Sequence, residues 1–494
     1  MFRSFPAICF LLMVSARAAF ADVNSQLDVN NVIWNVPGPT SSQSMPVGNG
    51  DIGLNVWVET NGDLVFYIGK TDSWNQDVNG DQGLMKVGGV RVSLNPSPLA
   101  GGATFLQTLK LRTGEIQIQE GTTTLRVWVD ANNPVIRVEA NHAQPRSLTV
   151  SLNNWRAPSA REVTLSGQTN RIAWYHRNPA NASPHVANLT FGAVIKGKGL
   201  VSQNDSTLTS AAPAASQLVS IYPLTATTSG ADEWLAQLDQ KIVQIDKLKL
   251  EQTREAHQKW WDEFWHRSWV FVSGDQDATN ATQGCVLQRF ITACGGRGAY
   301  PIKFNGSIFI VDNPGSLQGN GRPTRAMSAD QRTWGGQYWF QNTRAMYWPR
   351  LMAGDFDIMM PLFKMYAGQL APNAAQVNGY YHHQGSYFAE TAPFWGGLRY
   401  WGPEVKEDWT GHYFTPILEL SMMMLDYYEY TGDKKFAKET LVPVASAGLT
   451  FLINISRAIP KASFCSIPTT PSKCIGRFTI PRRTSADCRL FWRA

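Results

Sequence analysis

The 494-residue sequence predicts a multidomain chain in which strands come first and helices follow. Short alternating runs of apolar and polar residues, separated by turn residues, fill residues 31–223. Apolar residues at helical spacing begin near residue 232, and five or six helical segments follow. We therefore expect an N-terminal β-sandwich (a supersandwich), a linker helix and an incomplete (α/α)6 toroid, since six helical hairpins need twelve helices.

Residues 1–21 are typical of a secretory signal peptide. Arg3 precedes an apolar run from Ala7 to Val14, and Ala19-Phe20-Ala21 supplies a small-residue cleavage site. Arg17 is unusual in such a leader. No other stretch has the roughly 20 consecutive apolar residues of a membrane span. We expect a secreted or periplasmic protein, cleaved after Ala21, with no membrane span.

The predicted sandwich domain covers residues 22–228. Alternation with a turn every ten or so positions is the pattern of a β-sandwich. The strands are expected at residues 63–68, 90–94, 115–119, 124–129, 135–139 and 148–152.

The predicted linker helix occupies residues 229–270. One long helical stretch runs from Asp232 to Trp265, with an acidic start and apolar residues at helical spacing. Those apolar residues are Leu235, Leu238, Ile242, Ile245 and Leu248.

A partial (α/α)6 catalytic domain is expected over residues 271–452. Its helical candidates lie at about 279–294, 336–352, 355–370, 410–430 and 434–453. Asp433 is placed to cap the last of them.

The final residues, 453–494, are basic and rich in Cys, Pro, Ser and Thr. Residues 456–494 contribute +7 and the leader +2 to the overall charge of +6, which leaves the body at −3. A mildly acidic body gives no electrostatic reason to bind nucleic acid. A shifted reading of the codons for Pro468–Ala494 gives more enzyme-like sequence, which predicts a frameshifted, non-native tail after about Leu452. A disordered native tail is the alternative.

Two cysteines lie in the body of the chain, Cys285 and Cys294. Nine residues of helix separate them by about 13 Å, which is too far for a disulfide. We interpret them as buried thiols.

Two aromatic-rich segments predict a sugar-binding cleft. WGGQYWFQNTRAMYW begins at Trp334, and GYYHHQGSYFAETAPFWGG ends at Gly397. Aromatic faces stack on pyranose rings, and a carboxyl among aromatic rings tends to have a raised pKa. For any one ring, a place in the core is the more common outcome. The candidate substrate contacts are Trp334, Tyr338, Trp339, Arg344, His382, His383, Tyr387, Trp395 and His412.

The sequence predicts no metal or other cofactor. Adjacent His382 and His383 in a strand would point to opposite faces, and no further ligand is spaced to complete a site.

The order of several motifs carries a family resemblance. Met45-Pro46-Val47-Gly48-Asn49-Gly50-Asp51-Ile52-Gly53 alone indicates only a tight turn. It is followed by Gly69-Lys70-Thr71-Asp72-Ser73-Trp74, Lys303-Phe304-Asn305-Gly306 and QYWFQNTRAMYW. In this order, residues 31–452 resemble glycoside hydrolase family 95, the α-L-fucosidases and α-L-galactosidases, within the six-hairpin glycosidases. The overall pattern most closely resembles the bacterial domain of unknown function 5703.

The resemblance implies catalytic roles for Glu390 and Asn342. Glu390 lies where such enzymes place the general acid, although a lone loop glutamate is more often a solvated charge. Two asparagines polarise the attacking water in the fucosidases. Asn342 matches the second, whereas Phe340 occupies the first position and cannot hold a water.

The catalytic base of the resembled families comes from a later hairpin, beyond residue 452. Inversion needs a second carboxylate about 6.5–9.5 Å from the acid. Asp355 and Asp357 look like residues at a helix start, and Glu404 and Asp408 are candidates for the cleft. The carboxylates available are Asp330, Asp355, Asp357, Glu404, Glu407 and Asp408.

Three functions follow as hypotheses. The first is an exported glycosidase that acts on a terminal, α-linked sugar of an oligo- or polysaccharide with inversion, impaired by truncation. The second is a carbohydrate-binding or inactive fragment. The third is a polysaccharide lyase, against which the strand-first order argues. The sugar, the linkage and the choice between hydrolysis and phosphorolysis stay open.

The frameshift hypothesis predicts a defined nucleotide sequence. An open frame should continue for a few hundred codons in the shifted register after codon 452. Sequencing the gene past the stop codon tests this, and a shifted frame that closes at once would contradict it.

Overall fold

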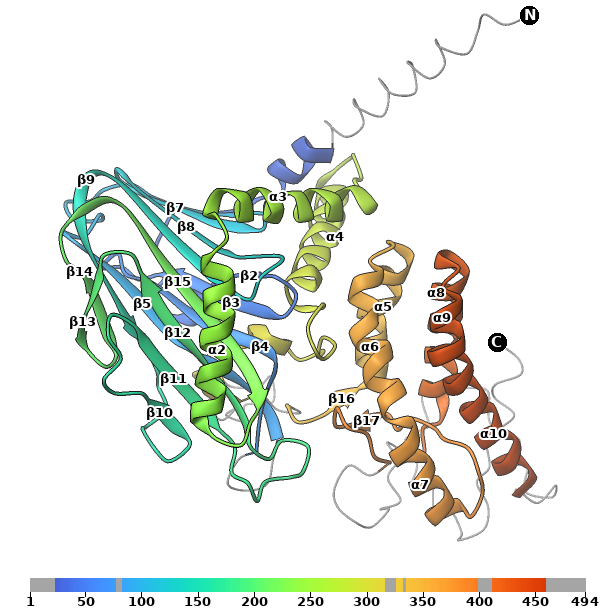
Figure 1. The fold of residues 1–494 in the computed structure, drawn as a ribbon. Coiled ribbons are helices and arrows are strands. Elements are labelled where there is room, and N and C mark those ends of the chain that lie inside the picture. Colours follow the sequence, from blue (N-terminus) through green and yellow to red (C-terminus); the bar gives the residue numbers. More distant parts are fainter. Residues whose placement is uncertain (1–22, 77–81, 316–325, 332–334, 399–410, 459–494) are drawn as a thin grey trace, which may run out of the picture. The chain divides into compact units, whose positions relative to one another are not determined.

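The structure is a computed structural model that describes residues 23–76, 82–315, 326–331, 335–398 and 411–458. The chain divides into two compact units, which are drawn together in Figure 1. The first unit comprises Met1–Gly335 with Ala353–Ile358, and the second comprises Gly336–Met352 with Met359–Ala494.

The first unit is built on antiparallel strands, and each of the six predicted strand segments overlaps one of them to within one residue. Burial alternates along β6 and β7, as period-2 patterning predicts, whereas every residue of β3 is buried. The strands are β1 (Val32–Trp34), β2 (Met45–Gly48), β3 (Ile52–Val58), β4 (Leu64–Gln76), β5 (Gln82–Asn95), β6 (Phe105–Lys110), β7 (Glu115–Glu120), β8 (Thr123–Val129), β9 (Ile136–Leu152), β10 (Glu162–Thr164), β11 (Ile172–Arg177), β12 (Leu189–Gly197), β13 (Leu200–Asn204), β14 (Thr207–Ser210) and β15 (Ala214–Thr227).

Strand β9 joins the two parts of this β-domain. Its first half pairs with β8 and β15, in the order β1-β6-β7-β8-β9-β15-β12-β11-β10. Its second half pairs with β5 and β14 and so carries the run β2-β3-β4-β5 and the hairpin β13-β14. The predicted strands at 135–139 and 148–152 are therefore one 17-residue strand. The predicted order, a β-sandwich followed by a helical region, is confirmed.

The predicted single linker helix is two helices, α2 (Ala231–Asp246) and α3 (Leu250–Arg267). Helix α2 buries Trp234, Leu238, Ile242 and Ile245 against side chains of β11, β12 and β15. Leu248, predicted to continue this face, is 45% exposed at the break. Apolar spacing persists across the break, so the sequence periodicity did not reveal it.

Helix α3 is anchored to the loops of the β-domain by hydrogen bonds from its aromatic face. The indole Nε1 of Trp265 donates to the carbonyl oxygen of Leu111 at 2.9 Å. The imidazole of His257 bonds the carbonyl oxygen of Thr113 through Nε2 at 2.8 Å. These two hydrogen bonds hold α3 against the loop between β6 and β7.

Helix α4 (Gln276–Gly295) begins at Asp275, whose carboxylate accepts the N–H groups of Asp277 and Ala278. Cys294 is buried, as predicted, but Cys285 lies on the exposed face, so its predicted burial is wrong. Both thiols are free.

The second unit contains most of the remaining helices. The carboxylate of Asp433 accepts the N–H of Phe436 at 3.0 Å, which confirms the predicted cap. Helix α7 was not predicted, and α6 begins within the first unit. The elements are β16 (Tyr338–Trp339), α5 (Phe340–Met352), α6 (Phe356–Gly368), α7 (Leu370–Tyr381), β17 (Thr391–Ala392), α8 (Thr415–Thr431), α9 (Lys434–Phe436), the π-helical turn η4 (Ala437–Leu441) and α10 (Val442–Ala458).

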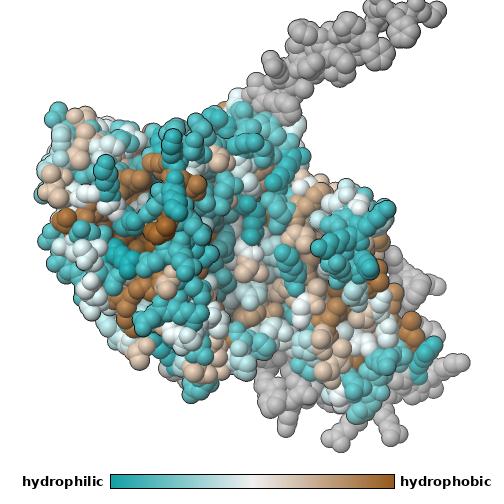
Figure 2. Space-filling model, in the orientation of Figure 1, coloured by the Kyte–Doolittle hydropathy of each residue, from teal (hydrophilic) through white to brown (hydrophobic). Residues whose placement is uncertain are grey.

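Helices α8 and α10 expose apolar side chains, and apolar patches cover this region in Figure 2. The exposed residues include Met422, Leu425, Val442, Leu449 and Ile453. By length and composition alone, Lys434–Arg457 would be sufficient to cross a membrane. A core helix meets the same criterion, so one such helix is weak evidence for a span.

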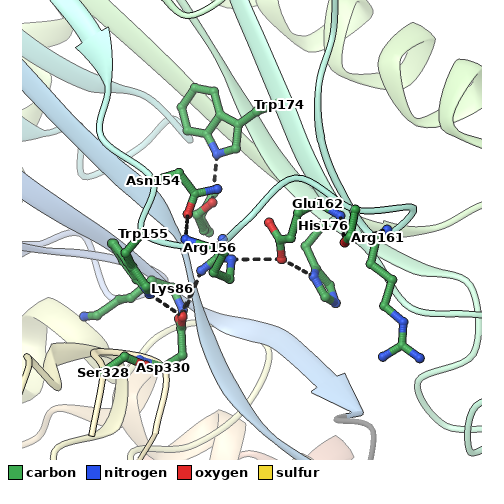
Figure 3. Close-up of polar contacts among 12 residues, drawn as sticks. Lys86, Asn154, Trp155, Arg156, Arg161, Glu162, Trp174, His176, Ser328 and Asp330 are labelled. Atoms are coloured by element: carbon green, nitrogen blue, oxygen red, sulfur yellow. Dashed lines mark hydrogen bonds and ion pairs between the residues drawn. The ribbon is translucent and has the colours of Figure 1, made fainter.

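A buried chain of charges attaches residues 326–331 to the sheet (Figure 3). Asp330 accepts hydrogen bonds from Arg156 at 3.1 Å, from the indole Nε1 of Trp155 at 2.6 Å and from the backbone N–H of Lys86 at 2.8 Å. The Arg156 guanidinium also pairs with Glu162 at 2.8 Å. Asp330, one of the carboxylates considered as a base, is thus fully engaged as an anchor.

A second aspartate anchors the chain just before this point. The carboxylate of Asp312 accepts hydrogen bonds from the hydroxyl groups of Tyr67 at 2.7 Å and Ser41 at 2.8 Å. The buried Lys86 ammonium donates to the carbonyl oxygen of Ile308 at 2.6 Å. The segment that leads to the helical unit is therefore attached to the β-domain at several points.

We predict that Asp330→Ala destabilises the first unit by about 3 kcal/mol, because Arg156 would remain buried without one of its two carboxylates. Urea unfolding followed by tryptophan fluorescence measures the change. Asp277→Ala, at an exposed position of α4, is the control and should cost less than about 0.5 kcal/mol. Equal effects of the two substitutions would contradict the anchoring role.

Candidate active site

A short β-ribbon brings the two aromatic-rich segments together. Tyr338 pairs with Ala392, and Trp339 pairs with Thr391. This pairing places Glu390 at the N-terminus of α5. Its backbone carbonyl oxygen accepts the N–H of Phe340 at 2.9 Å, and its Oε1 accepts the N–H of Gln341 at 2.8 Å. Glu390 thus satisfies two of the N–H groups that a helix start leaves without partners.

The carboxyl group of Glu390 is fully buried, at 0% exposure. Burial raises its pKa to about 7, against the lowering effects of the Gln341 N–H and the Arg344 charge. Its second oxygen, Oε2, has no hydrogen-bond partner within the described part of the chain. The raised pKa was expected from the sequence.

A cluster of aromatic rings includes Tyr366, whose hydroxyl is close enough to Glu390 to be affected by its charge. The ring of Tyr366 lies 5.8 Å from that of Phe340 and 4.9 Å from that of Phe388. The pKa of the Tyr366 hydroxyl is raised by burial and further by the charge of Glu390. An apolar, aromatic setting of this kind favours the neutral carboxyl.

Burial alone does not identify an acid. Glu120, on β7, is also fully buried, and burial raises its pKa to about 8. What distinguishes Glu390 is its position at a helix start, with one oxygen fixed and the other unpartnered.

Glu419, on α8, is a site residue that the sequence analysis missed. Its carboxylate pairs with Arg344 at 2.5 Å and accepts the indole N–H of Trp348 at 2.8 Å. Its charge contributes to the raised pKa of Glu390. A lone acidic residue within the apolar run Pro416–Leu425 was the available signal.

Asn342 is exposed in the first turn of α5, next to the residue whose N–H binds Glu390. Phe340 is buried, at 1% exposure. The predicted role of Asn342 in holding a water stays a prediction. Arg344 pairs with Glu419, and its predicted contact with substrate stays a prediction.

The second aromatic segment packs into a cluster of rings. The hydroxyl of Tyr387 donates to the carbonyl oxygen of Gly411 at 2.6 Å, and its ring lies 4.6 Å from that of Phe451. The Nδ1 atom of His412 bonds the Tyr381 hydroxyl at 3.0 Å. Because Tyr338 and Tyr387 are 1% and 2% exposed, both rings belong to the core of the unit.

His382 and His383 lie at the end of α7, where the sequence analysis placed a strand. His382 is exposed and adopts the left-handed conformation, with φ of 57°, that ends the helix. The His383 ring lies 5.7 Å from Tyr381 and 5.3 Å from Phe451. The described residues contain no cluster of three or more potential metal ligands.

Trp339 and Trp395 are partly exposed, and their predicted role as sugar contacts stays a prediction. Trp334, Glu404, Glu407 and Asp408 lie outside the described residues.

Asp355 and Asp357 both pair with arginines of the first unit. Asp355 is fully buried and accepts two hydrogen bonds from Arg289, at 2.7 and 3.0 Å. Asp357 lies in the first turn of α6 and pairs with Arg267 at 2.6 Å. Their predicted place at a helix start is confirmed, and these pairings give each a structural role.

Two families match the chain. Residues 33–183 and 180–270 match the N-terminal domain of the domain of unknown function 5703, and residues 312–472 match the glycosyl hydrolase family 95 catalytic domain. No curated protein matches. The resemblance drawn from the motifs is therefore confirmed.

A solved structure assigned as a kojibiose phosphorylase from the human microbiome is similar, with a TM-score of 0.53 and 11% sequence identity. The similarity covers 86% of this chain and 59% of that one, so this chain spans about three fifths of its length. At this identity the likeness shows a shared fold, in agreement with the predicted six-hairpin architecture.

We predict that Glu390 makes stability depend on pH. The unfolded carboxyl releases its proton near its usual pKa of 4.5, whereas the folded one holds it to about 7. The stabilising contribution is therefore complete below about pH 4.5 and is lost as the pH rises to 7. Thermal unfolding of wild type and Glu390→Gln between pH 4.5 and 8 measures it. Equal pH dependence in the two proteins would show that Glu390 does not titrate in this range.

Proposed function

We propose that this protein, which joins an N-terminal domain of the 5703 family to a family 95 catalytic region, cleaves the glycosidic bond of a terminal, α-linked sugar with inversion. The observation that carries the proposal is the carboxyl of Glu390, with a pKa of about 7 at the start of α5. A general acid is most effective when its pKa lies near the working pH.

The two oxygens of Glu390 suit different tasks. Oε1 is held as an acceptor by the Gln341 N–H, so the acidic proton is expected on the unpartnered Oε2. In the proposed reaction Oε2 donates that proton to the glycosidic oxygen as the bond to the anomeric carbon breaks. A water on the opposite face attacks that carbon and gives its proton to a base.

The electrostatic setting keeps this proton in place near neutral pH. Burial disfavours the carboxylate, and the Glu419 charge adds to that effect. Arg344 would stabilise the carboxylate more strongly if it were not already paired with Glu419. The Arg344–Glu419 pair therefore supports the acid function of Glu390.

Substrate access requires a change in the packing around Glu390, because the carboxyl is fully buried in this structure. Sugar rings would stack on the partly exposed Trp339 and Trp395. We also propose that the protein is exported, on the basis of the leader at residues 1–21.

We predict that Glu390→Gln lowers turnover of α-linked oligosaccharides by about 10²–10⁴-fold, the contribution of a general acid. The glutamine amide oxygen can still accept the Gln341 N–H, so the fold should persist. In wild type, activity should fall as the pH rises through about 7, when Glu390 loses its proton. Product release with and without inorganic phosphate, followed by NMR, gives the rate, the anomer formed and the nature of the nucleophile.

Glu429→Gln is the matched control, because Glu429 is an exposed glutamate of α8. It should leave turnover unchanged. Full activity of Glu390→Gln would remove Glu390 from the mechanism. Sugar binding without turnover in wild type would instead favour a carbohydrate-binding protein.

A further inference from the structure

The β-domain contains a pocket of about 430 Å³ that the proposed reaction does not use. This volume lies within the usual range for small-molecule sites. Residues of the motifs Pro46–Gly53 and Gly69–Trp74 form one side of it. The lining residues are Asn49, Asp51, Lys70, Ala131, Asn132, Asn133, Pro134, Pro223, Leu224, Thr225, Lys241 and Arg297.

A buried lysine of the pocket lining holds two carboxylates together. The Lys70 ammonium lies 2.8 Å from Asp51 and 2.7 Å from Asp72, and Lys70 is only 7% exposed. Burial opposes its charge, but Asp72 and Asp51 outweigh this and raise its pKa. A buried ion pair of this kind is weak evidence for stability alone. In this pocket, the ion pair with Lys70 fixes the position of the Asp51 carboxylate, which stays partly exposed.

Arg297 lines the pocket and forms no ion pair with a carboxylate of the described residues. Its guanidinium lies over the ring of Trp260, 3.7 Å from the centroid, and donates to the carbonyl oxygen of Asn49 at 2.5 Å. Gly50, with φ of 98°, makes this approach possible, because a Cβ there would lie 2.5 Å from the Cβ of Arg297. The tight turn of the motif therefore makes room for the arginine.

Lys241, on α2, is a second cation of the lining and is exposed. It forms no ion pair with any described residue. The lining has three cations (Lys70, Lys241 and Arg297) and one carboxylate (Asp51), and Asp72, outside the lining, pairs with Lys70, so the group as a whole carries one net positive charge. That charge is complementary to a ligand with a single negative charge.

We propose that this pocket binds a sugar that carries a carboxylate, a hexuronate unit of an acidic glycan. Lys241 and Arg297 would pair with the carboxylate, and Asp51 and Asn132 would bind hydroxyl groups. Pro134, Pro223 and Leu224 supply an apolar wall for the C–H face of the ring. The choice of a sugar among small carboxylates rests on the proposed carbohydrate function.

Isothermal titration of the full chain with D-glucuronate, D-glucose and inorganic phosphate tests this proposal. Wild type should bind glucuronate at least about 5-fold more tightly than glucose, and added salt should weaken the binding. Lys241→Glu should weaken glucuronate binding by about 10-fold or more. Lys247→Glu, an exposed lysine just after α2 and outside the lining, is the control and should change it less than 2-fold.

Several outcomes would overturn the proposal. They are no detectable glucuronate binding, equal binding of glucose, phosphate binding as tight as that of glucuronate, and equal effects of Lys241→Glu and Lys247→Glu. Glu390→Gln should keep full glucuronate binding. Glu390 is not a lining residue of the pocket. If the glycosidase proposal fails, glucuronate binding is unaffected, and if the pocket proposal fails, glucuronate binding is absent whether or not Glu390→Gln lowers turnover.

Discussion

The need to neutralise buried charge governs both units of this protein. A charged group taken out of water is costly unless it is paired and hydrogen-bonded. In the β-domain, Arg156 lies between Glu162 and Asp330, and Lys70 lies between Asp51 and Asp72. Three of these pairs join residues that are close in the sequence, whereas the pair of Arg156 with Asp330 joins residues 174 positions apart and so constrains where the chain runs.

The anchors on the β-domain include residues at the start of the segment that matches family 95. The family 95 match starts at residue 312, but the helical unit starts at residue 336. Between them, Asp312 and Asp330 bind Tyr67 and Arg156 of the β-domain. The family boundary and the packing boundary therefore differ by about two dozen residues. The first part of the segment that matches family 95 therefore belongs structurally to the β-domain.

Glu390 shows the other consequence of buried charge. Burial raises the pKa of this carboxyl to about 7, and among the described residues only its Oε1 has a hydrogen-bond partner. Burial within strand β7 likewise raises the pKa of Glu120, to about 8. The helix start, the aromatic setting and the neighbouring Arg344–Glu419 pair make Glu390 the better candidate for chemistry.

The sequence by itself determined the order of β-domain and helical region, the approximate strand segments and the Asp433 cap, and it singled out Glu390 as a carboxyl among aromatic residues. These follow from local periodicity, capping preference and composition, which act over a few residues. Only the tertiary structure decided that the linker is two helices, that Cys285 is exposed and that Tyr387 is in the core. It also paired Glu419 with Arg344, 75 residues apart, and Asp330 with Arg156, 174 residues apart. The physical reason is that the packing of elements distant in sequence decides which charges and rings come into contact. A local sequence pattern contains no information about those contacts.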